Sequence, residues 1–78
     1  MNKYIATFHS HYGALTYCQA LKNQGINARL APVPRQVSSS CGTCVLYTND
    51  NPIDLDELDE LDGVFLDGKG GLECVIRK

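Results

Sequence analysis

A pair of prolines divides this chain into two parts. Pro32 and Pro34 follow residues 26–30, where apolar and polar side chains alternate, and this alternation predicts a half-buried strand. Neither proline can donate a backbone hydrogen bond to a sheet, and the residue before each is pushed toward extended geometry. The strand must therefore end there. Residues 35–43 show neither a helical nor a strand period and predict a long polar loop.

The part of the chain before the prolines predicts a strand followed by a helix. Residues 3–8 are rich in aromatic and β-branched side chains, which is typical of a strand. Residues 13–23 carry apolar side chains at helical spacing. Ser10 is suited to cap this helix at its N-terminus, and Gly25 lies where a glycine is expected after a helix end.

The part after the loop predicts a strand at 45–48, a second helix and a final strand. Asn51 as a cap and Pro52 in the first turn are start signals for that helix, and Asp62-Gly63 is its expected end. Its apolar side would be formed by Leu55, Leu58 and Leu61. Residues 64–66 then predict a strand, which the turn at 67–71 and residues 72–76 could extend into a hairpin.

The resulting order is strand, helix, strand, strand, helix, strand over a single domain of residues 1–78. This order predicts an α+β fold of the ferredoxin-like βαββαβ type, a two-layer sandwich with two helices on one face of an antiparallel sheet. A chain of 78 residues has room for one hydrophobic core.

Charge and hydropathy restrict the class of protein. The formal net charge is -2 and the basic residues are scattered, which argues against a nucleic-acid partner. No apolar run approaches the ~18 residues of a membrane span, and Met1 to Ala6 lacks the apolar core of a signal peptide. We therefore expect a cytoplasmic protein with no membrane partner. Because that compartment is reducing, the four cysteines are not expected to form structural disulfides.

Cys41 lies in the polar loop, in a context that favours a reactive thiol. A thiolate needs solvent access and nearby donors or positive charge. Gly42 allows the backbone N–H groups around it to form an anion-binding concavity, and Arg35 could supply the charge if the loop curls back. Three hydroxyl groups precede the thiol, those of Ser38, Ser39 and Ser40. We expect Cys41 to be used chemically, with these neighbours stabilising its thiolate.

The same loop carries a resemblance to a known family. Pro32-Val33-Pro34-Arg35, followed by Ser38-Ser39-Ser40-Cys41-Gly42, resembles the signature of a small bacterial family of selenium/sulfur carrier-like proteins. The likeness covers most of the chain and extends to Phe8, Ala14, Leu21-Lys22 and Gly25-Ile26.

This resemblance implies a carrier that holds sulfur or selenium on Cys41 as a persulfide or selenosulfide. The implied partners are a donor such as a cysteine desulfurase and a protein that accepts the atom. The transfer requires no cofactor, and the chain would act as a carrier more than as an enzyme, although sulfurtransferase-like activity stays open.

Two other functions stay open. Cys41 and Cys44 form a Cys-x-x-Cys pair, so the chain could be a thiol–disulfide redox protein in which Cys44 is the resolving thiol. Such pairs normally open a helix, whereas this one runs into a predicted strand, and we expect Cys44 to be a small apolar residue of that strand. The other alternative is a non-catalytic protein-interaction module.

The remaining candidates are weaker. Cys18 and Cys74 fall at core periods and are expected to be buried, and one cysteine pair is too few for a zinc site, so no metal is predicted. His9 or His11 could shuttle protons to Cys41, although a plain polar junction is the favoured interpretation. An acidic stretch is expected to be a solvated helix face, with docking to a basic patch as the alternative; it comprises Asp54, Asp56, Glu57, Asp59, Glu60 and Asp62. The sequence leaves the oligomeric state undetermined.

Overall fold

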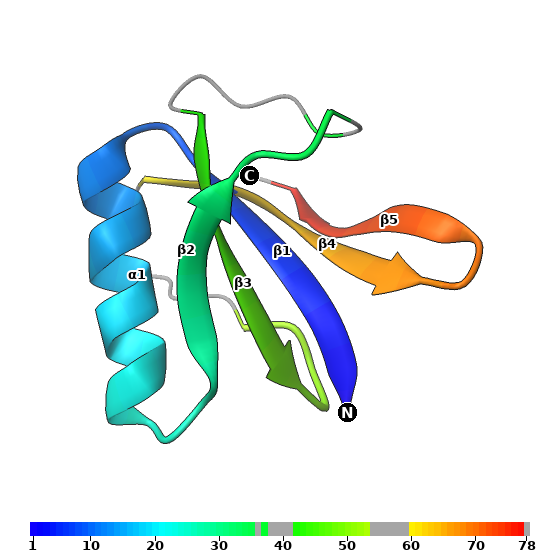
Figure 1. Cartoon of the computed structure of the whole chain (residues 1–78), viewed down its shortest axis with the longest axis horizontal. Helices are drawn as coiled ribbons and strands as arrows, with labels where there is room; N and C mark the ends of the chain where they lie inside the picture. Colours follow the sequence, from blue (N-terminus) through cyan, green and yellow to red (C-terminus); the bar gives the residue numbers. More distant parts are fainter. Residues whose placement is uncertain (36, 38–41, 54–59, 78) are drawn as a thin grey trace.

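A five-stranded antiparallel sheet dominates the described part of the chain (Figure 1). The computed structural model describes residues 1–35, 37, 42–53 and 60–77. The elements follow in the order β1 (Asn2–Phe8), α1 (His11–Asn23), β2 (Ala28–Pro32), β3 (Thr43–Asn49), β4 (Leu61–Gly68) and β5 (Gly71–Arg77). In space the strands are ordered β2-β3-β1-β4-β5, so β1 is the central strand.

The expected two-helix, ferredoxin-like sandwich is wrong. The described residues form five strands with one helix. The expected second helix falls partly on residues 54–59, which lie outside the described residues, and its expected last apolar residue, Leu61, instead begins β4. Leu61 pairs with Phe8, and Gly63 pairs with Thr7. Pairing with the central strand and burial of Leu61 outweigh the local helical spacing, as tertiary context commonly does.

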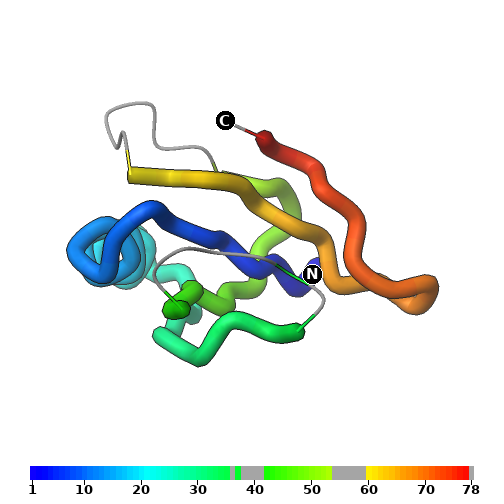
Figure 2. The backbone as a smooth tube through the Cα atoms, turned by 90° about the horizontal axis from the view of Figure 1, so that it is seen from above, coloured from blue at the N-terminus to red at the C-terminus, as the bar shows by residue number. Residues whose placement is uncertain are grey.

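The C-terminal residues form a strand of their own. Gly68 pairs with Gly71 across a tight turn, and β5 returns along β4, so the hairpin that the sequence left open is present. The turn of this hairpin lies at the end of the molecule away from α1 (Figure 2). β5 is consequently an edge strand of the sheet.

The predicted helix is confirmed, with both of its end signals. Ser10 Oγ accepts a hydrogen bond from the backbone N–H of Gly13 at 3.2 Å. At the other end the N–H of Gly25 donates to the Lys22 carbonyl at 3.0 Å. Gly25 has a φ of +80°, a left-handed conformation that glycine adopts without steric cost.

One face of the sheet packs against α1 to form the main core. Since side chains alternate between the two faces of a strand, every second residue of β1 points toward the helix. The buried residues of this core are Tyr4, Ala6, Phe8, Ala14, Tyr17, Cys18, Leu21, Ala28, Val45, Tyr47, Leu61 and Val64. We call this face the helix face and the opposite one the open face.

Two buried tyrosines hold the backbone that follows β3. The hydroxyl of Tyr17 donates to the Ile53 carbonyl at 2.7 Å, and the Ile53 N–H donates to the hydroxyl of Tyr47 at 3.0 Å. The ring centroids of Tyr17 and Tyr47 are 5.9 Å apart. Burial raises the pKa of Tyr47, and the hydrogen bonds with Tyr17 and Ile53 oppose that rise. We call this arrangement the tyrosine clamp.

The open face is buried at one end. Thr7 and Cys44 pair across β1 and β3 and are both 0% exposed, and Ile5 and Val37 are 6% exposed. Ile5, Cys44 and Val37 are not part of the core under α1. Thr7 and Cys44 lie where β3 begins, so a second buried group occupies the end of the open face next to the polar loop.

Candidate functional site

The described residues border the predicted site. Arg35, Gly42 and Cys44 are described, whereas the predicted reactive Cys41 and its neighbours lie outside the described residues, namely Ser38, Ser39 and Ser40. The geometry of the site is therefore built from the two ends of the loop and from the elements that meet them.

The sheet holds the two ends of the loop together. Pro32 pairs with Thr43 at the ends of β2 and β3, and the N–H of Val33 donates to the Gly42 carbonyl at 3.2 Å. Gly42 is exposed and has a φ of +72°. A side chain at this position would meet no atom within 4 Å, so the demand for glycine is conformational.

A turn follows the proline pair at the other end of the loop. The N–H of Val37 donates to the Pro34 carbonyl at 3.1 Å, and Arg35 lies within this turn with an exposed side chain. Val37 is buried. One apolar side chain of the loop is thus anchored while the guanidinium beside it is in solvent.

Cys44 lies inside β3 and is fully enclosed. Its side chain is 0% exposed, and its Sγ lies 3.6 Å from the Pro32 carbonyl oxygen, to which it donates. It points to the open face, beside Thr7. A thiol from solvent therefore cannot reach this sulfur in the folded chain.

The other two cysteines differ from each other. Cys18 is 4% exposed and belongs to the core, so its predicted burial is confirmed. Cys74 is exposed, so its predicted burial is wrong. A register shift between Val64 and Phe65 pairs Cys74 with Phe65 and Ile76 with Val64. Because Phe65 and Val64 face opposite sides of the sheet, this irregularity breaks the two-residue period from which the sequence prediction was made.

The N-terminal end of α1 meets the strand that follows the loop. Nδ1 of His11 lies 3.3 Å from Oγ1 of Thr43, and Thr43 is two residues after Cys41. The first turn of α1 contains no acidic residue. The first N–H groups of a helix lack intrahelical partners and carry a partial positive charge, which favours an anion nearby.

His9 makes a different contact from His11. Its Nε2 lies 3.9 Å from Oδ1 of Asp62 in β4, and the hydroxyl of Thr7 donates to the other oxygen of Asp62 at 3.5 Å. Of the two histidines considered from sequence, His11 is therefore the one beside β3. The contact between Thr43 and His11 could not be predicted from the sequence, because the two residues are 32 positions apart.

The described part of the chain contains neither a metal-ligand group nor a membrane-spanning helix. Residues 1–35, 37, 42–53 and 60–77 include no group of three or more His, Cys, Asp or Glu side chains arranged to hold a metal ion. Within the same ranges, no helix has the length and apolar character needed to cross a membrane.

Comparisons with known proteins agree with the resemblance seen in the loop. The chain is 31% identical over 48 residues to the uncharacterized protein YtiA of Escherichia coli (strain K12), an alignment that takes in 62% of this chain and 56% of that relative. The chain thus spans about half the length of that relative. No solved structure matches the chain. The model of the family described as "Putative Se/S carrier protein-like" matches residues 3–61, so the chain belongs to this family.

Proposed function

We propose that the chain carries sulfur or selenium covalently on Cys41 and passes the atom to a partner protein. Membership of the Se/S carrier-like family supports this function. The observation that carries it in this chain is the 3.3 Å contact between His11 and Thr43, because it brings a helix N-terminus and an imidazole to the strand end that follows the thiol.

Covalent geometry limits how far Cys41 can lie from that contact. Consecutive Cα atoms are about 3.8 Å apart, so the Cα of Cys41 is within about 8 Å of the Cα of Thr43. A helix N-terminus stabilises a nearby exposed anion by about 0.3–1 kcal/mol. We propose that this helix N-terminus favours the thiolate form of Cys41, because thiolate is the species that reacts.

The proposed transfer consists of two displacements at sulfur. In loading, the Cys41 thiolate attacks the outer sulfur of a persulfide on a donor protein; the donor's S–S bond breaks and its thiolate leaves. In unloading, a nucleophile on the acceptor attacks the outer sulfur of the Cys41 persulfide, and the Cys41 thiolate leaves. With selenium the carried species is a selenosulfide. Neither step consumes a cofactor. His11 is the proposed residue for taking up the proton of the Cys41 thiol before loading and for returning it to the Cys41 thiolate after unloading.

A cysteine desulfurase is the proposed kind of donor, and the proposed compartment is the reducing cytoplasm, where a thiol stays available. We favour carriage over thiol–disulfide exchange because the chain belongs to the Se/S carrier-like family. Cys44, the second thiol that a redox pair would use, is 0% exposed, so a thiol from another protein cannot reach it directly in the folded chain.

Intact-protein mass spectrometry tests the proposal. After incubation with a cysteine desulfurase and cysteine, the wild-type chain is expected to gain the mass of one sulfur atom, and Cys41→Ser is expected to gain none. Cys74→Ser is the control because Cys74 is an exposed thiol outside the loop, and this variant should load like the wild type. Loading of Cys41→Ser, or loss of loading in Cys74→Ser, would overturn the assignment to Cys41.

A second measurement tests the role of His11. His11→Gln keeps a polar side chain at an exposed helix position, so its circular dichroism spectrum should match that of the wild type. Its loading rate is expected to fall several-fold at neutral pH, because the amide of glutamine cannot take up and return a proton. An unchanged rate would show that the contact with Thr43 is structural only.

A further inference from the structure

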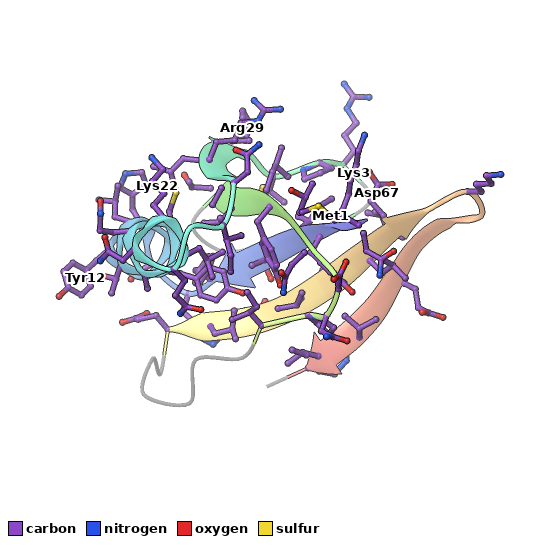
Figure 3. All side chains as sticks on the ribbon, turned by 90° about the horizontal axis from the view of Figure 1, so that it is seen from below. Met1, Lys3, Tyr12, Lys22, Arg29 and Asp67 are labelled. Carbon is purple, nitrogen blue, oxygen red and sulfur yellow. The ribbon has the colours of Figure 1, made fainter. Side chains whose placement is uncertain are left out.

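The open face of the sheet carries a group of charged side chains far from the loop in strand register. Arg29 of β2 pairs with Leu46 of β3, and Lys3 of β1 pairs with Thr48 of β3 on one side and with Asp67 of β4 on the other. By strand alternation all of these side chains share the open face. Figure 3 shows Lys3 and Arg29 projecting from the same side of the sheet, with Asp67 beside Lys3.

A hollow of about 200 Å³ lies among these side chains. Its open-face lining comprises Lys3, Ile5, Arg29, Leu46, Thr48 and Asp67. Ile5 is buried and Leu46 is half-buried, so the floor of the hollow is apolar. The cations at its rim are exposed and come from two strands that lie on either side of β3.

Neither cation is neutralised by an ion pair within the part of the chain that the structure describes. The ion pair recorded there joins His9 to Asp62. Asp67 lies opposite Lys3 in register, without an N–O approach within 4.0 Å, so the lining carries two positive charges against one negative charge. A site with an apolar floor, a net positive rim and a hydroxyl from Thr48 is complementary to an anion with an apolar body.

We propose that this hollow binds a small organic carboxylate, with the carboxylate between Lys3 and Arg29 and the apolar part over Leu46 and Ile5. The volume suits a ligand of about ten non-hydrogen atoms or fewer, smaller than the drug-sized ligands that fill pockets of roughly 300 Å³ and above. This proposal is independent of the function proposed for Cys41. The hollow extends from the row of Ile5 to the row of Lys3, two to four residues along β1 from Thr7, which puts it about 7–13 Å from the end of the sheet where the loop begins.

Nuclear magnetic resonance titration of the full chain tests this site with two matched probes. Benzoate and benzamide have nearly the same size and shape, and only benzoate is charged. We expect benzoate to shift the amide signals of Leu46 and Thr48 saturably, with an affinity of roughly millimolar order for so small a ligand. Benzamide is expected to bind at least about 5-fold more weakly. Added salt is expected to weaken benzoate binding, since the contact is charged and exposed.

Variants separate the charges of the hollow from the overall charge of the chain. Arg29→Gln and Lys3→Gln are each expected to weaken benzoate binding about 3- to 5-fold. Lys22→Gln is the control, because Lys22 is an exposed cation on α1 (Figure 3) that does not line the hollow. It should leave the affinity unchanged.

Four results would overturn the proposal. These are equal binding of benzamide, an equal loss in Lys22→Gln, no saturable shift at Leu46 and Thr48, and tighter binding of inorganic phosphate than of benzoate. The last result would show that the apolar floor contributes nothing and that the ligand class is wrong.

Discussion

The tyrosine clamp gives the sharpest test of how the described chain is held together. Tyr17→Phe removes one hydroxyl and keeps the ring, so the ring contacts with Phe8 at 5.0 Å and with Tyr47 at 5.9 Å are retained. What is lost is the 2.7 Å hydrogen bond to the Ile53 carbonyl, together with the hydrogen bond between the hydroxyls of Tyr17 and Tyr47. Tyr17 is 0% exposed, so water cannot replace the hydroxyl from that side.

The loss of stability in Tyr17→Phe depends on whether the Ile53 carbonyl finds another hydrogen-bond partner. A neutral hydrogen bond contributes about 1 kcal/mol net, and a buried carbonyl without a partner costs about 1–3 kcal/mol. Because Ile53 is half-buried, solvent can reach part of its backbone. We therefore expect Tyr17→Phe to lower the free energy of unfolding by about 1–2 kcal/mol. For a domain of this size that corresponds to a fall in Tm of about 4–16 °C.

Urea unfolding followed by circular dichroism measures this loss, with the m-value expected to stay constant. Tyr12→Phe is the matched control, since Tyr12 lies on the same helix but is 71% exposed; it should change stability by less than about 0.5 kcal/mol. Tyr47→Phe removes the acceptor of the Ile53 N–H. Its effect should not be additive with that of Tyr17→Phe, because the two hydroxyls hold the same peptide segment. A loss in Tyr17→Phe no larger than that in Tyr12→Phe would refute the clamp.

Three further predictions concern titration, thiol access and packing. Burial raises the pKa of Tyr47, so the stability that the protonated Tyr47 hydroxyl contributes is complete below its unfolded pKa of about 10 and is lost as the pH rises through its higher folded pKa. The urea midpoint of the wild type should therefore fall above about pH 10, and that of Tyr47→Phe should fall less steeply. A wild-type midpoint that does not change with pH would contradict this. Cys74, which is exposed, should react with iodoacetamide in the folded chain. Cys44 is 0% exposed and should react at least about 100-fold more slowly, because its thiol becomes accessible only after a local unfolding that costs about 3 kcal/mol. Peptide mapping after brief labelling distinguishes the two cysteines. Gly13→Ala should lower the free energy of unfolding in urea by about 1–3 kcal/mol, because the added Cβ would clash with the Cβ of Glu60. The cost of this overpacking exceeds the gain of about 1 kcal/mol in helix propensity. A more stable variant would show that Glu60 can move aside without cost.

Local signals predicted the elements that local contacts hold. α1 is fixed by the Ser10 cap, by its apolar spacing and by Gly25, all of which lie within or beside the helix. The strands at both sides of the proline pair were likewise recognised from their composition. The loop itself was identified because Pro32 ends β2 and no periodic segment follows until β3.

The errors arose where distant pairing decides the structure. Leu61 completes a helical spacing in the sequence, yet it pairs with Phe8 more than fifty residues earlier. Cys74 was expected to be buried because its residue period matches that of Ile76, and an extra residue between them in β5, Val75, breaks that period. Neither event leaves a mark in the nearby sequence.

The two binding regions were visible to different degrees. Cys41 stands out in the sequence because its hydroxyl and glycine neighbours are adjacent to it along the chain. The hollow on the open face has no such signal, since Lys3, Arg29 and Asp67 come from three different strands. Only the register of the sheet brings these side chains together.

The position of β1 has a practical consequence for anyone who shortens this protein. The family match ends at Leu61, the first residue of β4, so a fragment trimmed to the matched span would lack the strand that pairs with one whole side of β1. In the fragment, β1 would become an edge strand with a row of unpaired backbone N–H and C=O groups. Such an edge can pair with strands of other copies and lead to aggregation. Aggregation of that fragment would result from the missing strand β4 and would carry no information about the chemistry of the loop.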